Sequence, residues 1–526
     1  MPTLKINGTD VTVEKGTTII KAAEQLGIEI PHYCYHPGLS IAGNCRMCLV
    51  DVEKMPKPQI SCHIQCQDGM VVHTESEKVK KLREHILEFL LVNHPLDCPV
   101  CDQAGECGLQ DYYMEHGLYD SRVNETKVKK KAKAKPIGPT IMLDSERCIL
   151  CSRCVRFTDE ITKTGEFGIF NRGDHSEIGV GKELNNKYSG NVADICPVGA
   201  LTDRDFRFKC RVWYLQKTES VCPGCSRGCN ITVEANLDRP QHGAGERVMR
   251  LKPRFNDQVN DWWMCDEGRY GYKFIDHDRV NAPILRIDGA VRQTEWSEAL
   301  EGFLKSFKKL NAKEELAVLL SPQMTNEELY LAKRFFEKDL GIEHLYLVRS
   351  KPDGYQDDLL LRADKHPNRK GAEWIGFVEN EKQTAGLFNK LNKQIKGLII
   401  FGQDIVSLFP ELNLGRTISD LQFSVFVGSN HNQTSECVQY VFPAAVYAEK
   451  NGTFTNFEGQ VQRIQKAFPA LAESKPESEI LTILAEKLSL DWPYQSEEDI
   501  FSGLARSVSQ FQGMNYKKIG TEGIKA

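Results

Sequence analysis

The sequence lacks the features of a membrane-spanning, exported or nucleic-acid-binding protein. No window of about 18 apolar residues occurs anywhere, and no apolar signal-peptide core follows the first methionine. Basic residues do not outnumber acidic ones, with 67 Lys and Arg against 72 Asp and Glu, so the net charge of -5 gives no basic field for nucleic acid. We therefore expect a soluble chain in a reducing, cytoplasmic compartment, with membrane contact only through partner proteins.

A complete dinucleotide-binding fingerprint is also missing. The nearest glycine-rich run, His-Gly-Ala-Gly-Glu-Arg at 242–247, is incomplete and does not follow a strand pattern, so a turn is expected there. No nucleophile or acid–base constellation is needed to explain the other motifs. We expect no catalytic residue on this chain and no binding of NADH to it.

Cysteine, in contrast, is abundant and ordered. Fifteen of the 18 cysteines, with one histidine, fall into four successive sets within residues 34–265, and each set has the size and spacing of an iron–sulfur cluster site. Pairs at C-x2-C spacing without a signal peptide favour metal or redox chemistry over disulfides. Cys66, Cys210 and Cys437 stand outside the sets.

The first set follows a segment with the pattern of a small mixed α/β unit. Two short alternating strands are joined by the turn signal Asn7-Gly8, and a helix is expected within residues 17–27. The set itself is Cys34-x10-Cys45-x2-Cys48-x13-Cys62. One close pair with two more distant thiolates suits a [2Fe–2S] cluster, although the spacing departs from the plant-type pattern. Zinc is the alternative metal, and Cys66 is the alternative to Cys62 as the fourth ligand.

The second set is His94-x3-Cys98-x2-Cys101-x5-Cys107, after a stretch in which Leu82, Ile86, Phe89 and Leu90 recur at helical spacing. Taken alone, three cysteines and a histidine favour zinc. The position between other cluster motifs favours a [4Fe–4S] cluster, in which the neutral imidazole removes one negative charge and should raise the potential. A lysine run at 127–135 follows, and it is expected to be a solvated linker, with docking to an acidic partner as the alternative.

The third set is a triple, Cys148-x2-Cys151-x2-Cys154, with a distant Cys196 followed by Pro197. This is the pattern of half a bacterial ferredoxin. No second triple lies beside Cys196, so one [4Fe–4S] cluster that uses all four cysteines is the economical prediction. Zinc sites favour two pairs over a triple, which leaves structural zinc as the weaker alternative.

The fourth set is Cys222-x2-Cys225-x3-Cys229, completed after a longer interval by Cys265. Pro223, Gly224 and Gly228 are typical of a tight turn around a cluster. A further [4Fe–4S] cluster is expected. If this set is considered by itself, zinc is a serious alternative metal.

Residues 276–526 have the pattern of an alternating α/β domain. Buried strands are expected at 315–320, 343–348, 397–401 and 423–427, with helical stretches such as 325–340 between them, which predicts a parallel sheet. The run 449–462 resembles a late motif of molybdopterin oxidoreductases. No cysteine occurs between Cys265 and Cys437, and the segment is too short for the several domains of those enzymes, so we expect no molybdenum cofactor.

The order of these motifs is similar to that of the large iron–sulfur subunit of respiratory complex I, the bacterial G subunit. The similarity is carried by Ala42-Gly-Asn-Cys-Arg-Met-Cys48, His94-Pro-Leu-Asp-Cys-Pro-Val-Cys-Asp-Gln-Ala-Gly-Glu-Cys107, Arg147-Cys-Ile-Leu-Cys-Ser-Arg-Cys154 and Ile195-Cys-Pro-Val-Gly-Ala200. It covers residues 1–275 strongly and the rest weakly. It implies a subunit of NADH:quinone oxidoreductase, without an active site of its own, that receives electrons from the flavin and NADH-binding subunit and passes them toward quinone.

The same resemblance implies a multidomain α/β and α+β chain. Its segments would be a β-grasp [2Fe–2S] ferredoxin-type domain at 1–78, a His(Cys)3-ligated [4Fe–4S] domain at 79–118, a ferredoxin-like [4Fe–4S] domain at 137–214, a molybdopterin-oxidoreductase-type [4Fe–4S] domain at 215–275, and a reduced α/β domain of that type without molybdenum at 276–526. The fourth cluster would lie off the main path. The implied partners are other peripheral-arm subunits, including downstream iron–sulfur subunits, and the implied location is peripheral, on the cytoplasmic side of the inner membrane.

Three alternatives stay open at this point. A diaphorase subunit of an NAD-linked hydrogenase or formate dehydrogenase would share the first three sets. A catalytic molybdenum or hydrogenase subunit would need further metal ligands after Cys265. No cysteine-rich motif follows that residue, although a serine could replace the usual thiolate ligand of molybdenum. A zinc-binding scaffold would be colourless and redox-inactive.

Overall fold

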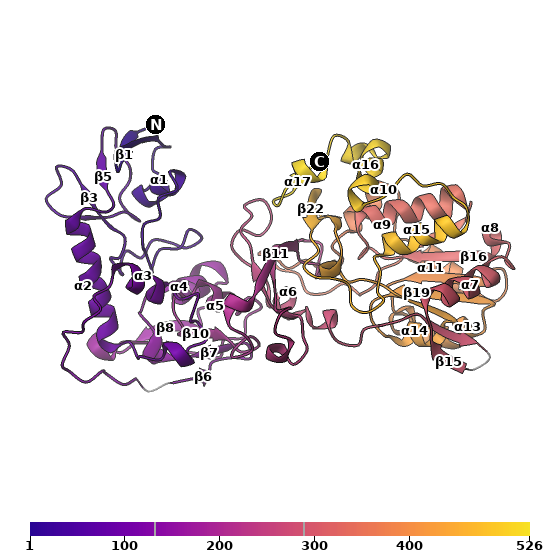
Figure 1. Ribbon diagram of the computed structural model, residues 1–526, viewed down its shortest axis with the longest axis horizontal. Helices are drawn as coiled ribbons and strands as arrows, with labels where there is room; N and C mark the ends of the chain where they lie inside the picture. The colour runs from indigo at the N-terminus through magenta and orange to yellow at the C-terminus, as the bar shows by residue number, and fades with distance from the viewer. Residues whose placement is uncertain (131–132, 288–289) are drawn as a thin grey trace. The chain divides into compact units, whose positions relative to one another are not determined.

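The computed structural model describes residues 1–130, 133–287 and 290–526, which form two units, Met1–Leu215 and Gln216–Ala526 (Figure 1). Lys131 and Ala132, part of the predicted lysine linker, lie outside the described residues. None of the helices described is both long enough and apolar enough to cross a membrane.

The N-terminal unit begins with a five-stranded sheet in the order β2-β1-β5-β3-β4. Its elements are β1 (Thr3–Ile6), β2 (Thr9–Thr12), α1 (Ile19–Gln25), β3 (Leu49–Val52), β4 (Gln59–Ile60) and β5 (Val71–His73). The predicted hairpin is confirmed, because β1 and β2 pair antiparallel and both Asn7 and Gly8 have positive φ. The predicted helix is also confirmed as α1, which buries its isoleucines and alanines against the sheet.

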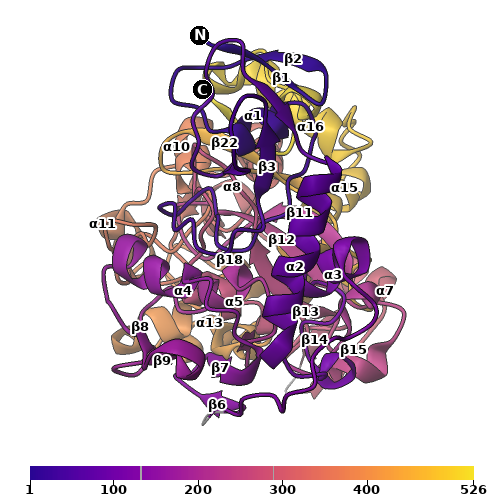
Figure 2. The same cartoon turned by 90° about the vertical axis from the view of Figure 1, so that its left-hand side faces the viewer.

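Helices and short strands make up the rest of the N-terminal unit. They are α2 (Glu77–Asn93), α3 (Gly108–His116), β6 (Lys135–Pro136), β7 (Ile141–Leu143), α4 (Arg153–Arg156), η3 (Phe157–Ile161), β8 (Phe167–Phe170), β9 (Glu177–Val180), α5 (Asn191–Ile195) and β10 (Leu201–Asp203). Figure 2 shows α2 and α3 side by side. The predicted helix is α2, but it buries Val79, Arg83 and Leu87, whereas Phe89 is 78% exposed.

The lysine run after α3 is bonded to the protein rather than only solvated, so the linker prediction was wrong in this respect. Lys127 Nζ donates to the carbonyls of Leu91 and Val92 at 2.7 and 3.0 Å, where it satisfies acceptors at the end of α2. Lys133 pairs with both Asp97 and Glu146 at 2.8 Å. The run therefore fastens the helix end and the loop that follows it.

The C-terminal unit is built on a seven-stranded sheet in the order β15-β14-β20-β19-β18-β16-β17. Its strands are β14 (Ile284–Ile287), β15 (Ala290–Gln293), β16 (Leu316–Leu320), β17 (His344–Leu347), β18 (Gly397–Phe401), β19 (Phe423–Gly428) and β20 (Tyr440–Pro443). Strands β16 to β20 pair in parallel, as predicted, and β14 and β15 add an antiparallel edge. All five residues of β16 are buried, as expected for a strand covered on both faces.

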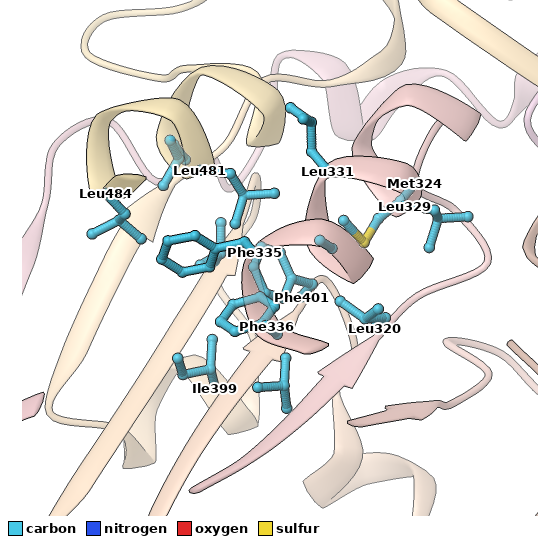
Figure 3. Packing of buried hydrophobic residues seen from close by; sticks show 14 of the residues in the cluster. Leu320, Met324, Leu329, Leu331, Phe335, Phe336, Ile399, Phe401, Leu481 and Leu484 are labelled. Atoms are coloured by element: carbon cyan, nitrogen blue, oxygen red, sulfur yellow. The ribbon is translucent and has the colours of Figure 1, made fainter. Parts of the chain in front are cut away.

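Helices cover both faces of this sheet. On one face lie α7 (Trp296–Phe307), α9 (Asn326–Ala332), α10 (Arg369–Ile375), α15 (Glu477–Lys487) and α16 (Glu497–Ser507), and on the other α11 (Glu381–Phe388), α12 (Ile405–Leu408) and α13 (Leu414–Ser419). In Figure 3 Phe335 and Phe336 fill the space between Ile399 and Phe401 of the sheet and Leu481 and Leu484 of α15. The helix predicted over 325–340 starts at a capping box on Thr325 and continues past α9 as a π-helical segment, η8 (Lys333–Asp339).

Two small sheets complete the C-terminal unit. Their strands are β11 (Gln216–Val221), β12 (Asn230–Ala235) and β13 (Val248–Pro253) in one, and β21 (Gly452–Thr455), β22 (Gln460–Ile464) and β23 (Ile524–Lys525) in the other. A short helix, α6 (Asp266–Tyr270), follows the first of them, and α14 (Gln433–Cys437) precedes β20. The turn between β11 and β12 carries most of the fourth cysteine set.

Candidate iron–sulfur sites

The first cysteine set is brought together by the loop after α1 and by the strands β3 and β4. Cys34 and Cys45 interact directly, since the Cys34 amide donates to Cys45 Sγ at 3.4 Å and the two thiols are hydrogen-bonded. The bond from Cys45 lowers the pKa of Cys34 to about 5. Cys48 and Cys62 are hydrogen-bonded in the same way. This bond raises the pKa of Cys62, and the charges of Cys34 and Cys45 raise it further. All four predicted residues therefore face one another.

Cys66 does not join this group of thiols. Its amide donates to the Thr17 carbonyl at 2.8 Å, and burial raises the pKa of its thiol. The structure thus places Cys62, not Cys66, with the other three cysteines.

The second set lies where α2 ends and α3 begins. His94 is the residue after the last turn of α2, and Cys107 is the one before the first turn of α3, so the two helix ends position both predicted ligands. His94, Cys98 and Cys107 line one pocket, and burial and the charge of Cys98 raise the pKa of Cys101. Burial lowers the pKa of His94 to about 4, which leaves its imidazole neutral at pH 7 with a lone pair for a metal.

The third set encloses a smaller pocket. Cys148, Cys151, Cys154 and Cys196 all line it. Leu150 and Ser152, between the first three, have φ of 56° and 61°, and the Leu150 amide donates to Cys148 Sγ at 3.4 Å. These left-handed residues wrap the loop around the thiols without any glycine, which is why no sequence signal marked them.

The fourth set encloses a pocket in the C-terminal unit. Cys222, Cys225, Cys229 and Cys265 line it together with Leu360 and Leu361. Cys265 precedes α6, and its Sγ accepts the Gly268 amide at 3.3 Å. Burial raises the pKa of Cys222 to about 12, while the charge of Lys351 opposes the shift. The pairing of Lys365 with Glu267 at 2.8 Å adds a further charged pair beside this pocket.

The thiols of the third and fourth sets are spaced as an iron–sulfur cluster requires. A zinc ion draws its ligands to about 2.0–2.3 Å, whereas a multi-iron cluster keeps its thiolates apart around a cavity. Four cysteines around a pocket, as in the third and fourth sets, match the second arrangement.

The three sets of the N-terminal unit surround one hydrophobic cluster, in which the third set contacts both others. Asn44, in the first-set loop, donates to the Leu150 carbonyl of the third-set loop at 3.1 Å. Gly199, in the third-set loop, lies so close to Cys101 that a Cβ built on it would be 2.2 Å from Cys101 Sγ. Residues of all three sets therefore meet in one cluster, which the order in the sequence does not reveal.

Two arginines that the sequence analysis did not single out hold the second-set loop. Arg211 donates to the carbonyls of Pro99 and Cys101, each at 2.6 Å. Arg147, which precedes Cys148, donates to Asp97 at 3.1 Å and is only 5% exposed. Arginines of this kind leave no spacing pattern in a sequence, because their partners lie far away along the chain.

The motif that resembles molybdopterin oxidoreductases is bonded within the protein. Asn326 donates to the hydroxyls of Thr453 and Thr455 at 2.9 and 3.0 Å, and Glu327 accepts the Thr453 amide at 2.8 Å. Thr453, Thr455 and Gln462 are all buried. The polar side chains of β21 and β22 are thus used in holding this unit together.

Five family models match successive parts of the chain. They are described as the 2Fe-2S iron-sulfur cluster binding domain at 1–77, the NADH-ubiquinone oxidoreductase-G iron-sulfur binding region at 83–122, the NADH-quinone oxidoreductase subunit 3 ferredoxin-like domain at 138–202, the molybdopterin oxidoreductase Fe4S4 domain at 215–277 and molybdopterin oxidoreductase at 368–487. All four cysteine sets lie within matched segments.

Curated relatives match over nearly the whole chain. The NADH-ubiquinone oxidoreductase 75 kDa subunit of Reclinomonas americana is 31% identical over 98% of this chain and 93% of its own length. The NADH-quinone oxidoreductase G subunit of Rickettsia conorii is 40% identical over 97% of this chain and 91% of its own length. The match to the G subunit of Rickettsia felis, at 41% identity, covers 64% of this chain and 49% of that protein.

The first of these alignments is 653 positions long, whereas this chain has 526 residues, so the relative carries segments that this chain lacks. Among solved structures, a chain of the H2-reduced NAD+-reducing [NiFe]-hydrogenase is 30% identical over 40% of this chain and 91% of its own length. Its TM-score of 0.37 is too low to support a structural conclusion.

Proposed function

Since the chain belongs to the family of G subunits of NADH-quinone oxidoreductase, whose members are also named 75 and 78 kDa subunits, we propose that it is an electron-transfer subunit of such a complex. In this role it receives electrons from the NADH and flavin-binding subunit and passes them toward quinone. The observation that carries the proposal is the meeting of three cysteine sets around one buried cluster of side chains.

The proposed ligands are the residues of the four sets. Cys34, Cys45, Cys48 and Cys62 would hold a [2Fe–2S] cluster, and three [4Fe–4S] clusters would be held by His94, Cys98, Cys101 and Cys107, by Cys148, Cys151, Cys154 and Cys196, and by Cys222, Cys225, Cys229 and Cys265. When bound, such clusters take up and release single electrons. The thiol–thiol contacts of the first set and the cysteine-lined pockets of the third and fourth sets support these assignments.

The protein's own contribution is to hold, insulate and tune these groups. Most of the proposed cysteine ligands are buried, so the chain excludes water from them. Amide donors such as Leu150 and Gly268 point at ligand sulfurs, where hydrogen bonds raise the reduction potential. The contacts of the third-set loop with both neighbouring loops support a path from the first to the third to the second set.

The finer domain division is part of the same proposal. We assign a β-grasp [2Fe–2S] domain to residues 1–78, [4Fe–4S] domains to 79–118, 137–214 and 215–275, and a molybdopterin-oxidoreductase-like domain without molybdenum to 276–526. The internal bonding of the motif at 449–462 supports the last assignment. The fourth cluster would be a side branch, and the partners would be other peripheral-arm subunits on the cytoplasmic side of the inner membrane.

An experiment on native membranes separates this proposal from a diaphorase of a hydrogenase or formate dehydrogenase. NADH should reduce the clusters of this chain, as seen by low-temperature EPR, and a water-soluble quinone should then reoxidise them. Reduction by H2 or formate without NADH, or no reoxidation by quinone, would overturn the proposal.

A further inference from the structure

One short helix connects the first and third cysteine sets. It begins directly inside the third triple as α4, carries Cys154, and continues as the π-helical turn η3, where the Thr162 amide donates to the Phe157 carbonyl at 3.2 Å. Single π-helical turns occur often at functional sites. From this helix Arg153, Arg156 and Glu160 reach the loop that follows Cys34, and Glu160 accepts the Ser40 amide at 2.9 Å.

The Arg156 guanidinium bonds to both ligand loops at once. Its Nη2 donates to the Cys34 carbonyl at 2.6 Å and to the Cys151 carbonyl at 3.3 Å, and its Nη1 donates to the Ser40 carbonyl. Cys34 belongs to the first set and Cys151 to the third. A single planar cation therefore joins the backbone of two ligand residues from different sets.

Arg153 repeats the arrangement one turn earlier. Its Nη1 donates to the Ile195 carbonyl at 3.1 Å, and its Nη2 donates to the Tyr35 carbonyl. Ile195 precedes Cys196 of the third set, and Tyr35 follows Cys34 of the first. Both sides of the junction are thus bonded through residues that are ligands or next to ligands.

Only arginine suits these positions. A guanidinium presents five donors in one fixed plane, whereas a lysine ammonium is a point charge on a flexible stem. Because these bonds go to neutral carbonyls, they fix the geometry without cancelling the cation's charge. A positive charge next to two anionic clusters favours the reduced form of each and raises its potential.

We propose that Arg156, assisted by Arg153, is a positioning residue for electron transfer, which fixes the separation of the first and third clusters and raises the reduction potential of both. The inference rests on the proposed function, because it requires clusters at both sets. It assigns a role to residues that do not ligate a metal and that the cysteine pattern does not mark.

The test uses the intact complex with three variants of this subunit. R156Q removes both the positive charge and the planar set of donors, whereas R156K keeps the charge but loses the planar donors. R204Q is the control. Arg204 is exposed and also donates to two carbonyls, those of Gly138 and Pro139, which lie outside the ligand loops. The readouts are iron content, the EPR midpoint potentials of the first and third clusters, and the dipolar broadening between them.

With R156Q we expect both midpoints to fall and the dipolar broadening to change. R156K should return the midpoints toward wild type while the broadening stays altered, and R204Q should match wild type. Wild-type midpoints and broadening in R156Q at full iron content would overturn the inference. If R156Q loses iron, R156K becomes the deciding variant, and dipolar broadening equal to that of the wild type in R156K would overturn the inference. Absence of cluster signals in the wild type would defeat the proposed function itself, which keeps the two failures distinct.

Discussion

Substitution of Gly199 by alanine should selectively disturb the second cluster. Gly199 is buried in the third-set loop, and an added Cβ would lie 2.2 Å from Cys101 Sγ and 3.2 Å from the Cβ of Gln103. Non-bonded heavy atoms prefer separations of about 3.5–4.0 Å, so the sulfur must move by more than about 1 Å. Gly199 does not have a positive φ, so the effect would be steric and not a backbone strain.

The size of this effect follows from the cost of overpacking. Forcing a methyl group into a packed interior costs about 1–3 kcal/mol, which is roughly a 5- to 150-fold change in an equilibrium. If the strain falls on the cluster-bound state, the second set should lose its iron while the first and third keep theirs. The matched control is Gly181→Ala, because nothing lies within 4 Å of a Cβ at that exposed position.

Iron analysis and low-temperature EPR of the two variants give the result. Gly199→Ala should lack the signal of the second cluster and keep a native circular dichroism spectrum, and Gly181→Ala should match wild type. A full second-cluster signal in Gly199→Ala, or an equal loss in Gly181→Ala, would refute the steric reasoning.

Three further predictions concern other parts of the chain. His94→Cys should keep the second cluster but lower its midpoint in an EPR redox titration, because a thiolate adds negative charge; an unchanged or higher midpoint contradicts the ligation. Gly268→Ala would put a Cβ 2.9 Å from Cys222 Sγ, so iron should be lost from the fourth set alone, and retention of all iron would count against it. Burial raises the pKa of Glu327 from about 4.5 to about 7, so the folded protein holds a proton that the unfolded chain releases, and stability should fall as pH rises through that range. Glu327→Gln should reduce this loss in thermal unfolding measured from pH 5 to 8, and an unchanged slope would show that another group is responsible.

Local patterns in the sequence predicted the elements well where burial and spacing act within one segment. The largely apolar runs predicted as strands at 315–320, 397–401 and 423–427 became parallel strands, because a strand buried on both faces needs no polar alternation. The turn at Asn7-Gly8 was readable for the same reason, since those two residues accept positive φ. The family resemblance rested on the cysteine motifs and is confirmed by the relatives.

Features that depend on contacts between residues far apart in the sequence could not be predicted from it. The meeting of the three sets depends on contacts such as that of Asn44 with Leu150, which lie 106 residues apart. Arg156 and Arg211 bond to carbonyls, and every residue type has a carbonyl, so no partner pattern exists to detect. The prediction for the lysine run used composition alone, and composition does not show that Lys127 donates to a carbonyl at the end of α2.

The central claim is that four ligand sets on this chain hold one binuclear and three tetranuclear iron–sulfur clusters. Metal analysis combined with quantitative low-temperature EPR of the reduced protein tests it most directly. We expect about 14 iron atoms per chain, one [2Fe–2S] and three [4Fe–4S] signals, little zinc and no molybdenum. Stoichiometric molybdenum, or zinc in place of the iron of any set, would contradict it.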